Sequence, residues 1–107
     1  MYTENNSVVA NDLGGGVQRK VLSYSENIMS VELHFEKGAI GALHSHPHEQ
    51  IGYVISGSLI YKEEGQEDKI LKTGDTYYVA PNVEHGVVAL EETMLFDVFT
   101  PMRKDFV

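Results

Sequence analysis

The chain of 107 residues contains no cysteine, no tryptophan and only three prolines. Without cysteine it has no disulfide, no thiolate ligand and no cysteine nucleophile, so a bound metal must use nitrogen and oxygen ligands. No apolar run approaches the roughly 18 residues of a membrane span, and no basic segment followed by an apolar core opens the chain. We therefore expect a soluble, cytoplasmic protein that has no membrane partner.

Basic side chains are also scarce. Sixteen acidic against eight basic residues give a formal net charge of -8, and the lysines and arginines are scattered along the sequence. This charge would repel a polyphosphate, so we expect no nucleic-acid partner. Hydrophobic residues make up 42% of the chain, enough for one modest core. Length and composition together predict one globular domain over residues 1–107.

Apolar residues recur at every second position far more often than at helical spacing. Met29, Val31, Leu33 and Phe35 alternate with polar residues, which is typical of a strand with one buried face. Turn sequences such as Thr73-Gly74-Asp75 separate similar runs. The expected strands are 18–22, 29–35, 40–44, 50–56, 59–63, 69–72, 76–79, 86–90 and 94–100. So many short strands predict an all-β sandwich or barrel.

The start of the chain lacks this pattern. Three consecutive glycines, 14–16, are not followed by the Lys-Ser/Thr ending of a phosphate-binding loop or by a helix pattern. We interpret residues 1–16 as a flexible lead-in and residues 17–100 as the barrel. Residues 101–107 are expected to form a C-terminal segment over the barrel mouth.

Four of the five histidines lie in two strand-associated segments. His44 and His46 are two residues apart, so on an extended strand both imidazoles point to the same side. His85, distant in the sequence, is the obvious source of a third nitrogen, and neutral imidazoles suit zinc, nickel, copper or iron. The alternative is a solvated, pH-sensitive histidine patch. His48 follows a proline that interrupts the alternation, so its participation stays open, and His34 is expected to face solvent.

The histidines belong to a longer pattern. The spacing Gly-x5-His-x-His-x3-Gln-x6-Gly, from Gly38 to Gly57, resembles the first motif of the cupins, whose usual fourth ligand is glutamate. A degenerate second motif begins at Gly74. The resemblance implies a single-domain cupin, a double-stranded β-helix of the jelly-roll type, with one divalent ion of zinc, nickel or iron. The residues that would hold this ion are His44, His46, Gln50 and His85.

Three further stretches narrow the resemblance: residues 16–22, 34–50 and 95–101. They are similar to the KdgF family, cupins of pectin and alginate breakdown in which glutamine is expected at position 50. The resemblance implies conversion of 4,5-unsaturated monouronates to linear 5-keto-4-deoxyuronates, by ring opening and ketonisation of a small anionic sugar acid. It also implies functional roles for Asp97, Phe99 and Arg103. Because Gln50 is neutral, the ion would keep its full charge and act as a strong Lewis acid.

The chemistry can also be argued from the residues near the end of the chain. Asp97 shares a strand face with Leu95 and Phe99. If that face lines the barrel, the carboxylate would remove a proton from the anomeric hydroxyl and deliver one to C4. Arg103 would fold over the mouth and bind the uronate carboxylate. The alternative is an outward-facing Asp97, or one that pairs with Arg103.

Two other functional classes stay open. A cupin oxygenase or polyketide cyclase would use the same scaffold for a different reaction, and a non-catalytic cupin would bind a sugar or another ligand without turnover. We also expect a homodimer, because small cupins are commonly dimers and a short chain gains buried core by pairing.

Overall fold

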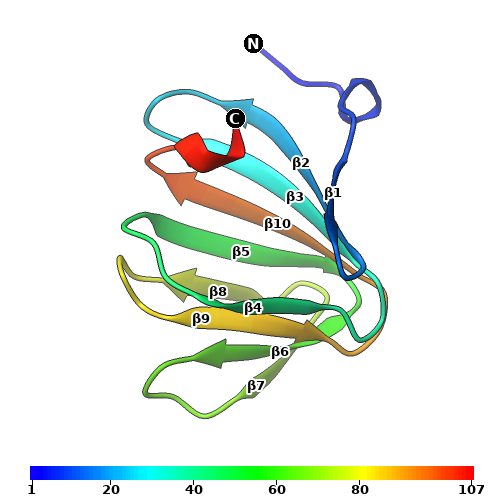
Figure 1. Ribbon diagram of the computed structural model, residues 1–107, viewed down its shortest axis with the longest axis vertical. Coiled ribbons are helices and arrows are strands. Elements are labelled where there is room, and N and C mark those ends of the chain that lie inside the picture. Colours follow the sequence, from blue (N-terminus) through cyan, green and yellow to red (C-terminus); the bar gives the residue numbers. More distant parts are fainter.

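The computed structural model describes all 107 residues, which form two antiparallel sheets curved around a common interior (Figure 1). The strands are β1 (Asn11–Gly14), β2 (Val17–Tyr24), β3 (Met29–Phe35), β4 (Ile40–His44), β5 (Glu49–Ser56), β6 (Ser58–Glu63), β7 (Lys69–Lys72), β8 (Thr76–Val79), β9 (His85–Ala89) and β10 (Thr93–Thr100). Two short 3-10 helices, η1 (Asn5–Ser7) and η2 (Lys104–Phe106), are the only helices, and neither is long and apolar enough to cross a membrane.

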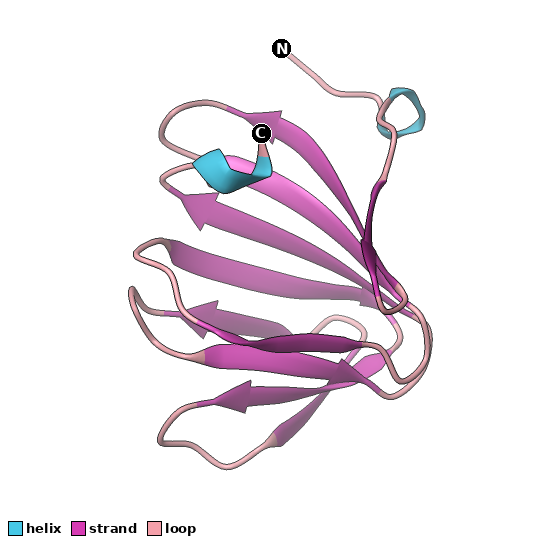
Figure 2. Cartoon of the chain, viewed as in Figure 1, coloured by secondary structure: helices cyan, strands magenta, loops and turns pink.

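The strand order follows from antiparallel pairing. One sheet has six strands in the order β1-β2-β3-β10-β5-β8, and the other has four in the order β4-β9-β6-β7. Figure 2 shows that loops and turns join strands throughout, with almost no helix between them. The all-β architecture predicted from the alternation of apolar residues is therefore confirmed, and β2 to β10 match the nine predicted strands to within two residues at each end.

The chain before residue 17 differs from the expectation. Residues 11–14 are strand β1, paired antiparallel with β2, so this part of the predicted flexible lead-in is ordered sheet. The three glycines form the turn of the hairpin, since all have positive φ, and the Gly14 amide donates a 2.9 Å hydrogen bond to Asp12 Oδ1. The glycine run is a tight turn because glycine adopts this backbone conformation without steric cost.

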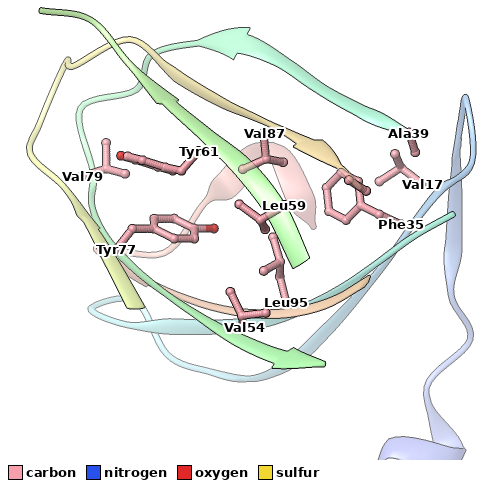
Figure 3. Packing of buried hydrophobic residues seen from close by; sticks show 11 residues of the cluster. Val17, Phe35, Ala39, Val54, Leu59, Tyr61, Tyr77, Val79, Val87 and Leu95 are labelled. Atoms are coloured by element: carbon pink, nitrogen blue, oxygen red, sulfur yellow. The ribbon is translucent and has the colours of Figure 1, made fainter. Parts of the chain in front are cut away.

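An apolar core fills much of the space between the sheets (Figure 3). Its 11 buried residues are Val17, Phe35, Ala39, Val54, Leu59, Tyr61, Tyr77, Val79, Val87, Ala89 and Leu95. The rings of Tyr61 and Tyr77 stack with centroids 4.7 Å apart. Full burial of a side chain such as valine, leucine or phenylalanine stabilises the fold by about 1.5–3 kcal/mol. A separate cluster of Met29, Val31 and Phe99 packs against Phe106 of η2, so the C-terminal segment is attached to the barrel through apolar contacts.

Gly52 fixes how Tyr77 enters this core. It lies on β5, with Tyr77 of β8 as its register partner on one side and Asp97 of β10 on the other. A Cβ at position 52 would lie 2.1 Å from Tyr77 Cζ. The missing side chain therefore leaves room for the Tyr77 ring to cross β5 toward Asp97.

Replacing Gly52 by alanine tests this packing. We expect Gly52→Ala to lower the free energy of unfolding by about 1–3 kcal/mol, because the buried ring must move. Urea unfolding of the purified variant measures the loss. In a Tyr77→Leu background the ring is gone, so the same substitution should cost clearly less. Equal costs in the two backgrounds would contradict the account.

Candidate functional site

A cavity of about 230 Å³ lies between the two sheets. Six of the seven predicted site residues line it: His44, Gln50, His85, Asp97, Phe99 and Arg103. The seventh, His46, is buried directly beside them, 2.9 Å from Gln50. Folding thus brings together residues from β4, β5, β9, β10 and the C-terminal segment.

The histidine cluster is built by strand pairing. His44 ends β4 and His85 begins β9, and the two are direct partners in the antiparallel register. His46 follows in the loop after β4, with its ring centroid 4.9 Å from that of His85 and 5.5 Å from that of His44. One ring nitrogen from each of the three lies within 4.8 Å of the others. The three histidines therefore converge as predicted, although His46 lies in a loop rather than on the extended strand that the prediction assumed.

The hydrogen bonds of the rings leave one nitrogen of each available. His44 Nδ1 and His85 Nδ1 lie 2.9 Å from the carbonyl oxygens of Ala42 and Val83, and since a carbonyl only accepts, both Nδ1 atoms carry the proton. His85 Nε2 is buried and has no hydrogen-bond partner. Metal-bound histidines show this arrangement, with one nitrogen donating to a carbonyl and the other ligating.

His46 and Gln50 point to the same conclusion. His46 Nδ1 donates to the carbonyl of His48, so in the neutral ring Nε2 is an acceptor, yet it lies 2.9 Å from Gln50 Oε1. Burial lowers the pKa of His46 to about 4 and also lowers the pKa of His85, so both rings are neutral at pH 7. Two lone pairs that face each other favour a cation between them. The residues present therefore fit a divalent metal ion.

Asp97 is fully enclosed in the cavity wall. Leu95, Asp97 and Phe99 are all buried along β10, as the alternation predicted. Tyr77 donates a 2.8 Å hydrogen bond from its hydroxyl to Asp97 Oδ1. Burial raises the pKa of Asp97 to about 6, although the neighbouring Tyr77, Gln50 and Arg103 oppose the shift. Sequence reasoning did not identify Tyr77 as the partner of this carboxylate, and Gly52 was the only local signal for it.

Arg103 lines the cavity, and its ion-pair partner is Asp105 rather than Asp97. Its Nε and Nη2 atoms donate to the two carboxylate oxygens of Asp105 at 3.0 and 2.8 Å, and its guanidinium lies 5.2 Å from the centre of the Phe99 ring. The pKa of Asp105 is lowered by this contact. The alternative pairing with Asp97 is therefore excluded in this structure.

The two remaining histidines lie outside the cluster. His48 Nε2 donates to the carbonyl of Met102 at 3.0 Å, so this ring holds the C-terminal segment in place. His34 Nε2 lies 3.4 Å from a carboxylate oxygen of the exposed Glu92, and His34 does not line the cavity of the site. Sequence reasoning also missed Arg19 and Phe106, which line the cavity from β2 and η2.

Comparison with known proteins agrees with this fold. The family model described as "Cupin domain" matches residues 31–99. The chain is 50% identical to the pectin degradation protein KdgF of Dickeya dadantii over 97 residues, which cover 89% of this chain and 87% of that protein. It is 37% identical to an oxalate decarboxylase of Bacillus subtilis over 87 residues, 73% of this chain but only 22% of the longer enzyme.

A solved structure is also similar over the full length. KdgF from a Halomonas species superimposes with a TM-score of 0.94 at 35% identity, and the match covers 100% of this chain and 98% of that one. These relatives support an enzyme with a metal site built on the three histidines. The two sheets, the motif histidines and the match over most of the chain lead to one conclusion: this protein belongs to the cupin family.

Proposed function

We propose that this protein is a ring-opening isomerase that converts 4,5-unsaturated monouronates to linear 5-keto-4-deoxyuronates in pectin and alginate breakdown. One observation carries the proposal: a fully buried carboxylate, Asp97, shares a single small cavity with the histidine cluster and with Arg103. That combination provides a proton carrier, a metal site and a cation for a sugar acid. The 50% identity to a pectin degradation protein supports the substrate class.

The metal ligands we assign are His44, His46, His85 and Gln50. When bound, a divalent zinc, nickel or iron ion would supply Lewis acidity toward the oxygen atoms of the substrate. Gln50 contributes a neutral amide oxygen, and its place on β5 beside His46 is fixed by pairing with Phe99 and Val79 on the neighbouring strands. A neutral fourth ligand preserves the charge of the site, which suits an anionic substrate.

Arg103 and Phe99 orient the substrate. Arg103 carries a planar guanidinium over the cavity and suits a carboxylate, which accepts two parallel hydrogen bonds from such a group. Phe99 is 3% exposed and packs edge-on to His46 with ring centroids 5.6 Å apart, so it forms an apolar wall next to the histidines. A sugar ring held beside this wall, with its carboxylate at the guanidinium, would expose its anomeric hydroxyl to the interior.

Asp97 moves the proton. Tyr77 occupies Oδ1, and we assign proton exchange with the substrate to Oδ2. The carboxylate accepts the proton of the anomeric hydroxyl as the bond between C1 and the ring oxygen breaks, which leaves an aldehyde at C1 and an enolate at C5. Asp97 then returns the proton to C4 while the enolate oxygen becomes the C5 ketone. Atoms balance in this sequence, so the reaction is an isomerisation without a co-substrate.

The metal assignment predicts a definite ion content. Purified protein should carry about one divalent ion per chain. His46→Ala should lose most of this ion because one of its four assigned ligands is removed. Elemental analysis by mass spectrometry measures both. His34→Ala removes a histidine outside the cluster and serves as the matched control. An unchanged metal content in the His46 variant would contradict the ligand assignment.

The reaction predicts a spectroscopic change. Ketonisation destroys the conjugation of the C4–C5 double bond with the carboxylate, so the enzyme should accelerate the loss of ultraviolet absorbance beyond the spontaneous rate. Asp97→Asn keeps the volume but cannot carry the proton, and we expect it to lower kcat by about 10²- to 10⁴-fold. A wild-type protein that binds uronates without exceeding the spontaneous rate would favour the non-catalytic binding cupin, and oxygen consumption would favour an oxygenase.

We also propose that two copies pair through an outer-face patch, which consists of the exposed Ile51, Tyr53, Ile55 and Tyr78 on β5 and β8. A chain of charge -8 repels its own copy, and this patch offers apolar side chains with a single acidic neighbour, Glu49, which accepts a hydrogen bond from the Tyr78 hydroxyl. Sedimentation should give a dimer that Ile51→Glu dissociates. Ile70→Glu on β7 is the control, because Ile51 and Ile70 are both 54% exposed. A monomeric wild-type protein would contradict the proposal.

A further inference from the structure

Arg19 is a second arginine in the cavity that the proposed mechanism does not use. It lies on β2 and lines the cavity together with Val17 of the same strand, while the intervening Gln18 is exposed. None of the side-chain hydrogen bonds in the structure involves Arg19, and its Nε atom is buried with no partner. Buried polar groups are normally paired, so a guanidinium that points into the cavity without a hydrogen-bond partner indicates a site for a ligand.

The position of Arg19 relative to Arg103 is defined by Phe106. The Arg19 guanidinium lies 3.8 Å from the centre of the Phe106 ring, and that of Arg103 lies 4.3 Å from it. Both cations thus contact one aromatic ring of η2 at the edge of the cavity. Asp105 occupies the Nε and Nη2 donors of Arg103, whereas it makes no hydrogen bond to Arg19.

The cavity therefore contains both guanidiniums of a chain that is acidic overall. Its lining contains two arginines and a single carboxylate, Asp97, which Tyr77 already engages through Oδ1. The chain as a whole carries a charge of -8, which opposes the approach of an anion. An anionic ligand would gain most from the guanidinium whose donors are unpaired.

We propose that Arg19 binds the carboxylate of the sugar acid and selects acidic over neutral sugars, together with Arg103, on the basis of the function proposed above. Arg19 supplies the available donors, and the Asp105 contact holds Arg103 in place over Phe99. Arg19 is thereby a specificity residue of this cavity. Loss of its guanidinium should weaken binding while the buried proton carrier and the histidine cluster stay intact.

The test compares two neighbours on one strand. Arg19→Gln removes the guanidinium inside the cavity, and Lys20→Gln removes the same charge one residue away, where Lys20 Nζ donates its side-chain hydrogen bonds to Asn5. We expect Arg19→Gln to raise KM for an unsaturated monouronate at least about tenfold, with kcat changed by less than about threefold. Arg19→Lys should recover part of the loss, and Lys20→Gln should match the wild type.

Binding of galacturonate, a saturated uronate, separates this proposal from the reaction. Calorimetry should show that wild-type protein prefers galacturonate to neutral galactose and that Arg19→Gln loses the preference. Arg19→Met, which retains an apolar contact with Phe106, should lose it as well while keeping the wild-type melting temperature. If wild-type protein shows this preference but no turnover, the proposed isomerisation is wrong, whereas the proposed role of Arg19 in binding the carboxylate is supported. A folded Arg19→Met or Arg19→Gln variant that keeps the preference overturns the proposal.

Discussion

Three imidazoles, a carboxylate and two guanidiniums line or adjoin one cavity of this small barrel, and the buried side chains among them, such as His46, His85 and Asp97, must be partnered. The strand register provides most of those partners. His44 faces His85 across β4 and β9, and Tyr77 reaches Asp97 because Gly52 between them has no side chain. Unpaired polar groups in such an interior are costly, so the sites without a protein partner, such as His85 Nε2, point to a ligand.

The C-terminal segment joins the site to the fold. Phe106 packs against the cluster of Met29, Val31 and Phe99, and His48 holds the carbonyl of Met102. These contacts fix the backbone on both sides of Arg103, which places its guanidinium over the cavity. A residue beyond the last strand thus acquires a defined position because the apolar surface of the barrel is completed by the segment that carries it.

The charged groups of the cavity differ from those of the surface. The surface is acidic, whereas the cavity contains the two arginines and, with a bound ion, further positive charge. Desolvation keeps His46 and His85 neutral and raises the pKa of Asp97, so the same burial prepares metal ligands and a proton carrier. One physical cause, the removal of these side chains from water, therefore accounts for several properties of the site.

The sequence by itself determined the nine strands β2 to β10 and the inward face of Asp97, because each depends on a period of two along one strand. It also carried the cupin motifs. Only the tertiary structure decided the partner of Asp97, the pairing of Arg103 with Asp105, the strand β1 and the place of Arg19. Those features depend on which strands lie side by side and in what register, and long-range pairing leaves no periodic signal within a single strand.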